Sequence, residues 1–226
     1  MAGPESLLSQ LGRVITATYG LTRPGSPLET FVIGDRGLLT LHADHWAEGR
    51  DLSRPGEAMV LLREEDDDTL VSLYYPDALI ENLERHDPRR GLCEENLRDF
   101  AVFVEELDHL LVLADASANG RQVAAVELEL HANVTVVLTA DLFHARSLGL
   151  RRLPEEESRA LRTALLDCGD YEGEESSGWR QRYLDARRAA WRFLDRLFET
   201  PRGERHALLQ RFSGAPLPEK LALCAA

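Results

Sequence analysis

The sequence is poor in lysine and in net positive charge. Lys220 is the only lysine, so arginine supplies nearly all of the 26 basic residues, which face 39 acidic ones and leave a formal net charge of −13. Phosphate groups are bound by clustered positive charge, so a chain this acidic has little general affinity for nucleic acid or for an anionic membrane. We expect no direct nucleic-acid binding, and a basic protein partner is the kind that this charge favours.

Cysteine and long apolar runs are also scarce. Cys93, Cys168 and Cys224 are far apart and form no CxxC pair, so neither a disulfide framework nor a zinc knuckle is predicted. No apolar stretch approaches the roughly 18 residues of a membrane span. The N-terminus has no basic start before an apolar run, which argues against a secretory signal. We therefore expect a cytoplasmic protein that does not bind membranes.

The common catalytic motifs are missing. The chain has no GxxxxGK[ST] phosphate loop, no GxGxxG, no HExxH and no GxSxG elbow. Its 226 residues, of which 44% are hydrophobic, are enough to bury a core as one large domain or two small ones. Function must therefore be sought in how polar residues are spaced along the predicted helices and strands.

The N-terminal third predicts one helix and a small sheet. Residues 5–19 have apolar residues at helical spacing and are followed by Gly20. Residues 28–34 and 38–43 flank the turn-like Asp35-Arg36-Gly37, and residues 58–64 and 69–75 flank an acidic turn. We predict two hairpins that form a four-stranded antiparallel sheet, with the N-terminal helix helping to cover it.

The remainder predicts helices, and the fold class is therefore α+β with a bundle-like helical half. Residues 121–147 are ambiguous, because VAAVELELHANVTVVL alternates like a strand but also has a helical apolar face. We choose a helix, with a hairpin as the competing interpretation. The chain is divided into 1–75 and 76–226, although one continuous fold fits equally well. The predicted helices span 76–86, 94–116, 121–147, 155–167, 179–200, 202–212 and 217–224.

Four residues after the second predicted strand form a first candidate metal motif. His42-Ala43-Asp44-His45 resembles the end of the metallo-β-lactamase signature HxHxDH, which implies metal-dependent hydrolysis. The resemblance covers these four residues only. Thr40 stands where that family has its first histidine, which removes one ligand.

Carboxylates and histidines on the two central helices form a second and preferred candidate. Glu106-x-x-His109 and Asp141-x-x-His144 resemble the Glu-x-x-His units of ferritin-like bundles, which hold iron or manganese. If the helices fold back on each other, however, these units lie about 15–20 Å apart. Residues 127–131 instead lie at about the same position along the helix pair as His109. The predicted metal ligands are Glu105, Glu106, His109, Glu127, Glu129 and His131, and the ion is iron, manganese or zinc.

Two functional classes follow from these observations. The first is a non-catalytic interaction or regulatory protein, with a homodimer as one form of self-association. Its N-terminal helix, small sheet and acidic pI resemble the effector-binding chaperones of bacterial secretion systems, although this chain is longer and has none of their motifs. The alternative is a metal-dependent enzyme with its site between the central helices. We expect the arginines of 179–200 to pair with acidic residues of the same chain.

Overall fold

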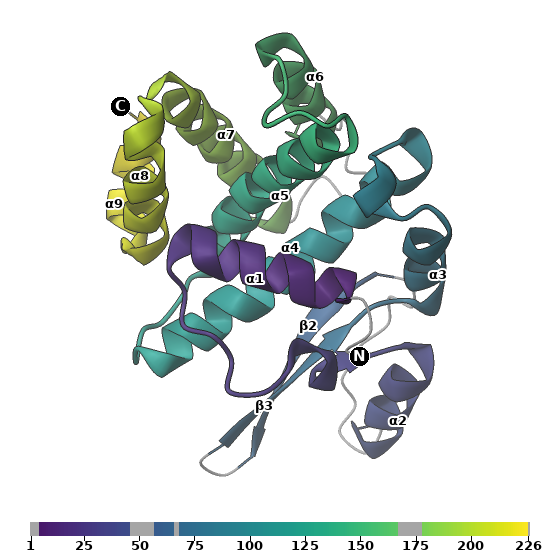
Figure 1. The fold of residues 1–226 in the computed structure, drawn as a ribbon. Helices are drawn as coiled ribbons and strands as arrows, with labels where there is room; N and C mark the ends of the chain where they lie inside the picture. The colour runs from purple at the N-terminus through teal and green to yellow at the C-terminus, as the bar shows by residue number, and fades with distance from the viewer. Residues whose placement is uncertain (1–4, 46–56, 66–67, 167–177, 226) are drawn as a thin grey trace.

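The fold is described from a computed structural model of the chain, and covers residues 5–45, 57–65, 68–166 and 178–225. This part is mostly helical, with a small mixed sheet near the N-terminus, which agrees with an α+β class (Figure 1). The helices are α1 (Leu7–Tyr19), α2 (Asp35–His45), α3 (Asp77–Arg85), α4 (Glu94–Ala118), α5 (Ala125–Ser147), α6 (Glu155–Leu166), α7 (Gly178–Glu199), α8 (Arg202–Gly214) and α9 (Leu217–Ala225), with 3₁₀ turns at Leu28–Thr30 and Pro88–Arg90.

The sheet has three strands rather than the predicted four. The strands are β1 (Val32–Ile33), β2 (Met59–Glu65) and β3 (Asp68–Tyr74), in the order β1-β3-β2. The second predicted hairpin is confirmed, because β2 and β3 pair antiparallel from Met59 opposite Tyr74 to Glu65 opposite Asp68. The first predicted hairpin is wrong. β1 is only two residues long and runs parallel to β3.

The error in the first hairpin has a physical cause in contacts between distant residues. Residues 35–45, expected to hold a turn and a strand, form helix α2. The start of α2 is fixed by other elements: the Tyr74 hydroxyl donates to Asp35 Oδ1 at 2.7 Å, and the Asp35 backbone N–H donates to Asp77 Oδ1 at 3.3 Å. Neither partner is visible in the local pattern that predicted the strand.

Apart from α2, the helices agree closely with expectation, because their boundaries are marked locally. Helix α1 begins after Ser6, whose hydroxyl accepts from the Ser9 N–H, and ends at Gly20 in the left-handed conformation with φ +71°. Helix α4 begins after Cys93, whose N–H donates to the Asn96 side chain. Residues 125–147 are a helix, as predicted. Because α5 contacts α4, α6 and α7, it carries apolar residues on several sides, which explains its strand-like alternation.

One hydrophobic cluster joins residues from both parts of the chain. It contains Leu11 of α1, Leu73 of β3, Phe100 of α4, Val134 of α5 and Phe193 of α7, each with an exposed fraction of 1% or less. Helices α1 and α3 pack on α4, which also contacts β2 and β3. The division of the chain near residue 75 into two domains stays a prediction.

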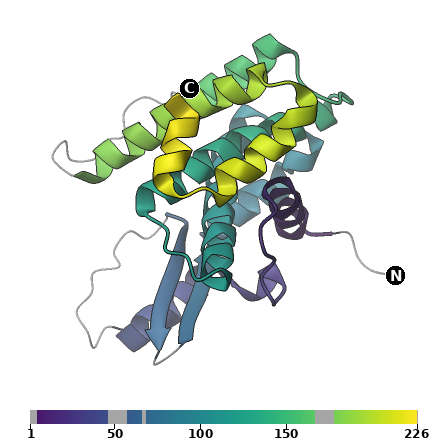
Figure 2. The same cartoon turned by 90° about the vertical axis from the view of Figure 1, so that its left-hand side faces the viewer.

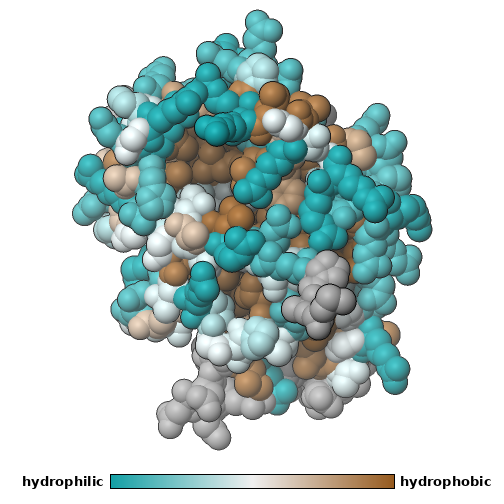
Figure 3. Space-filling view, in the orientation of Figure 1, coloured by the Kyte–Doolittle hydropathy of each residue, from teal (hydrophilic) through white to brown (hydrophobic). Residues whose placement is uncertain are grey.

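The C-terminal helices and the β2–β3 hairpin lie toward opposite ends of the molecule. Figure 2 shows α7, α8 and α9 together at one end and the β2–β3 hairpin at the other. On the face of Figure 1, hydrophilic side chains dominate, and apolar surface appears mainly in recesses between them (Figure 3).

Two cysteines are free thiols, Cys93 exposed and Cys224 buried, while Cys168 lies outside the described residues. No helix in the described part of the chain is both long and apolar enough to cross a membrane.

Candidate metal centre

The central pair of helices brings its acidic and imidazole side chains together in two separate groups. Helices α4 and α5 are consecutive, are joined by residues 119–124 and pack against each other. On α5, residues 127 and 131 are four apart and share a face, whereas residue 129 is offset from both by two positions, or about 200° around the helix. The six predicted ligands are therefore divided by the geometry of α5 itself.

The first group contains Glu105 and His109 of α4 and Glu129 of α5. Each offers one ligand atom, and these three atoms all lie within 4.8 Å of one another. Glu105 and His109 are four residues apart and so share a helix face. His109 is buried, whereas both carboxylates are partly exposed. An imidazole thus lies behind two carboxylates that solvent can reach.

His109 is held by a fourth residue, Glu106. Its Nδ1 lies 3.6 Å from Glu106 Oε2, an ion-pair contact between positions i and i+3. Its Nε2 is buried and has no hydrogen-bond partner among the described residues. A histidine that binds a metal through one ring nitrogen commonly donates the other N–H to a carboxylate, which fixes the ring and its tautomer. Glu106 lies on the Nδ1 side of the His109 ring at ion-pair distance, the side on which such a carboxylate is found.

The charges in this group perturb one another strongly. The pKa of Glu105 is raised to about 7, mainly by burial and also by Glu129 and Glu106, while His109 and Arg187 of α7 oppose the rise. Burial alone would lower the pKa of His109, but Glu106, Glu129 and Glu105 together raise it to about 9. The three carboxylates therefore stabilise the protonated imidazole of His109. The Glu105 carboxyl group itself carries a proton part of the time near pH 7.

The second group contains Glu127 of α5, which is buried and fully engaged. Its Oε1 accepts from Arg121 Nη1 at 2.8 Å and from the buried Lys220 of α9. Burial lowers the pKa of Lys220, and the contact with Glu127 offsets part of that effect. The only lysine of the sequence is therefore a buried ionic partner.

His131 also belongs to the second group and joins three helices. Its Nδ1 lies 2.8 Å from Asp108 Oδ2 of α4, and its Nε2 lies 3.1 Å from the Ser213 hydroxyl of α8. The Thr135 hydroxyl lies 2.8 Å from Asp108 Oδ1 and 3.0 Å from the Tyr19 hydroxyl. Burial and the nearby charge of Asp108 raise the pKa of Tyr19 far above its ordinary range. Polar atoms of four helices thus satisfy one another in the core.

Asp108, His131 and Ser213 have the order of contacts found in a serine-nucleophile triad. Substrate must reach the nucleophilic oxygen, yet Asp108 and His131 have exposed fractions of 0% and Ser213 of 4%. The Thr135 hydroxyl also donates a hydrogen bond to the second carboxylate oxygen of Asp108. The arrangement is therefore a structural network. Sequence reasoning missed Asp108 and Ser213, because Ser213 lies 82 residues from His131 and no local spacing joins them.

The other sequence motifs lie elsewhere. His42-Ala43-Asp44-His45 falls in α2 rather than after a strand, and its side chains are outside the described part of the structure. Asp141 accepts from the Ser158 hydroxyl of α6 at 2.6 Å and is not part of the metal group. Comparison of the chain with protein families, curated proteins and solved structures found no match in any of the three.

Proposed function

We propose that this protein binds one divalent transition-metal ion between α4 and α5, through Glu105, His109 and Glu129. The observation that carries the proposal is the buried His109 Nε2 without a described partner, within a group whose three ligand atoms lie within 4.8 Å of one another. One imidazole and two carboxylates are a ligand set that suits zinc, manganese or iron.

Charge balance supports a cation at this position. Glu105, Glu106 and Glu129 contribute three negative charges when ionised, and Arg187 contributes one positive charge nearby. A divalent cation bound to neutral His109 brings the sum to zero. The same groups with protonated His109 and no metal leave one negative charge in a largely buried place, which is unfavourable. Metal binding therefore replaces a proton on His109 and removes the repulsion from Glu129 and Glu106, which adds to the effect of burial on the pKa of Glu105.

Three protein ligands leave coordination positions for water or a substrate. Sites with three ligands and an open position are typical of catalytic zinc, whereas structural zinc sites have four protein ligands. A bound ion would acidify its water and polarise a carbonyl or phosphoryl group. The proposal is therefore compatible with a metal-dependent enzyme, and Glu106 would orient His109 without contacting the ion.

Elemental analysis and zinc titration of the purified chain test this proposal. We expect one equivalent of zinc, manganese or iron to bind, and binding to weaken at least tenfold in His109→Ala. The matched control is Glu84→Gln, which removes an exposed carboxylate of α3 and should leave the affinity unchanged. Failure of the wild-type chain to bind any of these ions above the level of His109→Ala would overturn the proposal.

A second candidate function is self-association through the β2–β3 hairpin, as an interaction module. Leu62 of β2 and Leu70 of β3 have exposed fractions of 56% and 51%. Leu62 lies opposite Val71 and Leu70 opposite Arg63, so the two leucines point to opposite faces of the hairpin. Within the described residues β2 has a strand neighbour on one side only. Exposed apolar side chains beside a free strand edge favour pairing with another chain.

Sedimentation of the purified protein tests the second candidate. We expect a dimer that dissociates in Leu62→Ser, and the control Leu221→Ser, at an exposed leucine of α9, should remain dimeric. A monomeric wild-type protein would contradict the proposal that the hairpin mediates self-association. The two candidates are independent, since the metal group and the leucines lie on different elements.

A further inference from the structure

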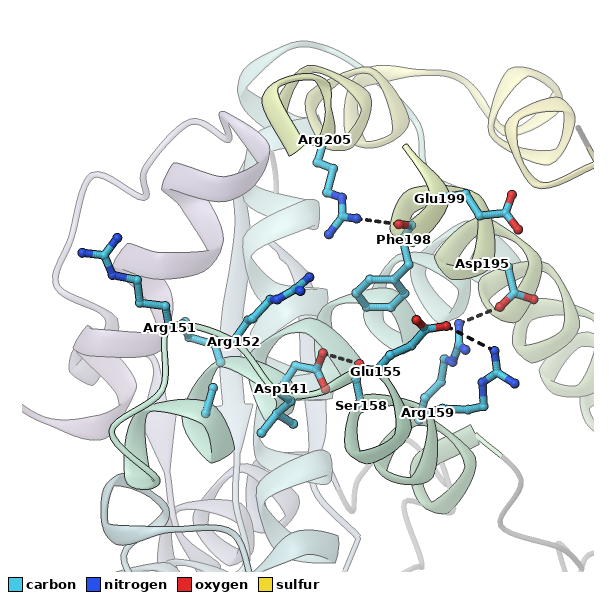
Figure 4. A pocket seen from close by; sticks show the side chains of 14 residues that line it. Asp141, Arg151, Arg152, Glu155, Ser158, Arg159, Asp195, Phe198, Glu199 and Arg205 are labelled. Atoms are coloured by element: carbon cyan, nitrogen blue, oxygen red, sulfur yellow. Dashed lines mark hydrogen bonds and ion pairs between the residues drawn. The ribbon is translucent and has the colours of Figure 1, made fainter. Parts of the chain in front are cut away.

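A second polar site lies in a cavity of about 470 Å³ formed by α5, α6, α7, the start of α8 and the segment between α5 and α6. Figure 4 shows its side chains, with Arg152 and Arg205 extending from opposite sides toward the Phe198 ring. Arg151 and Glu199 also line the cavity, with the ends of their side chains directed away from the Phe198 ring in the same view. The volume is within the range of small-molecule pockets.

Part of the charge in this cavity is neutralised internally. Arg162 Nη1 donates to Asp195 Oδ1 at 2.8 Å, and Arg159 Nη2 lies 3.5 Å from Glu155 Oε1. Both of these arginines belong to α6; in the 179–200 helix, for which pairing within the chain was expected, Arg188 Nη1 lies 3.6 Å from Asp185 Oδ1. Arg152 has no carboxylate within ion-pair distance in the described part of the chain.

Arg205 is held in position by backbone rather than by a carboxylate. Its Nε donates to the Thr200 carbonyl at 2.9 Å and its Nη2 to the Phe198 carbonyl. Burial and the charges of Arg202 and Arg152 lower the pKa of Arg205, so these guanidinium groups repel one another. Like charges close together that have no carboxylate at ion-pair distance among the described residues favour an anion between them.

A buried donor completes the site. Arg162 lines the cavity, has an exposed fraction of 5%, and has a buried Nε without a hydrogen-bond partner in the described structure. Its guanidinium carbon lies 4.7 Å from the Trp191 ring centre and 5.5 Å from that of Phe198, so the group is fixed between two aromatic rings. A buried donor that lacks an acceptor is costly unless a ligand or water satisfies it.

We propose that this cavity binds a phosphate monoester of a small organic molecule. Arg152 and Arg205 would bind the phosphate as a dianion, since two guanidinium groups match two negative charges. Arg162 Nε would donate one further hydrogen bond. Apolar side chains of Leu142, Leu153 and Phe198 line the same cavity and would contact the organic group. The site is distinct from the metal group, none of whose ligands lines this cavity.

Calorimetric titration with phenyl phosphate tests the proposal, with inorganic phosphate and benzoate as comparison ligands. We expect phenyl phosphate to bind more tightly than either, and its affinity to fall about tenfold in Arg152→Ala. Arg146→Ala is the matched control, because it removes a nearby exposed arginine of α5 that does not line the cavity. The affinity of this control variant for phenyl phosphate should stay within about twofold of the wild-type value. Both arginines are exposed, so both variants should fold normally, which thermal unfolding checks.

Three results would overturn the proposal. The first is no saturable binding of phenyl phosphate to the wild-type chain. The second is an equal loss of affinity in the two arginine variants, which would indicate general attraction by surface charge. The third is benzoate binding as tightly as phenyl phosphate, which would overturn the assignment of the ligand as a phosphate dianion.

Discussion

The two polar groups between α4 and α5 contain the same residue types but differ in how well their atoms are satisfied. Around His131, every ring nitrogen and carboxylate oxygen has a partner: Asp108, Ser213 and Thr135. Around His109, the carboxylates crowd one another, and the ring Nε2 has no described partner. A satisfied buried network stabilises a fold, whereas an unsatisfied one indicates a missing ligand. Burial and residue type alone would not have separated them.

The largest expected difference between the groups is in stability, and Asp108→Ala tests it. This substitution leaves His131 Nδ1 buried without its carboxylate and removes one acceptor of the Thr135 hydroxyl, which we expect to cost about 3–5 kcal/mol of unfolding free energy. Urea unfolding followed by circular dichroism measures it. The control Glu84→Ala, at an exposed position, should change stability by no more than about 0.5 kcal/mol. A cost below about 1 kcal/mol for Asp108→Ala would mean that the network does not stabilise the fold.

A smaller effect is expected in the pH dependence of the metal-free protein. The pKa of Glu105 rises from an ordinary 4.5 to about 7, so the folded chain binds more protons than the unfolded chain between these values. This stabilisation is complete below pH 4.5 and is lost as the pH rises through 7. His109, with its pKa raised from 6.5 to about 9, acts in the same direction at higher pH.

Glu105→Gln should therefore flatten the lower part of this profile. We expect the fall in unfolding free energy between pH 5 and 7.5 to shrink by about 2 kcal/mol in this variant, because glutamine does not titrate. Urea unfolding at several pH values, in buffers with a chelator, measures the change. A profile identical to that of the wild-type chain would show that Glu105 titrates normally and that its neighbours do not repel it.

Ser213→Ala should have a modest effect. The hydroxyl makes one contact with His131 Nε2 at 3.1 Å, and losing one neutral hydrogen bond costs about 1 kcal/mol. Thermal unfolding measures this change, and the stoichiometry of metal binding should not change. If this variant instead abolished an ester-hydrolysing activity of the wild-type protein while its stability stayed the same, the assignment of these residues to a structural network would be wrong.

How far the sequence predicted this molecule depends on the range of the interactions concerned. Apart from α2, the helices were predicted within a few residues, because boundary residues such as Gly20 and Pro76 and the apolar spacing are local. The first hairpin was predicted wrongly, because contacts of Asp35 with Tyr74 and Asp77 favour a helix over a strand. Such contacts join residues about 40 positions apart, which local patterns do not detect.

The candidate site was predicted in part for the same reason. Helical spacing placed Glu105 and His109 on one face. The antiparallel packing of α4 and α5 brought residue 129 to the same position along the helix pair. The sequence could not say which side of α5 faces His109, so Glu127 and His131 were grouped with Glu129. Their actual partners, Lys220 and Ser213, come from the last 15 residues of the chain. The arginine cavity was not predicted, since it combines residues 141–205 from four helices.

The most direct test compares Glu129→Gln with Glu127→Gln in thermal unfolding with and without saturating zinc. Glu129→Gln should leave the stability of the metal-free protein unchanged or slightly raised, and should abolish the stabilisation by zinc. Glu127→Gln should lower the stability of the metal-free protein, because Lys220 stays buried beside a neutral partner, and should keep the zinc-induced shift. A full zinc-induced shift in Glu129→Gln would contradict a metal site at Glu129, and loss of the shift in Glu127→Gln would contradict a purely structural role for Glu127.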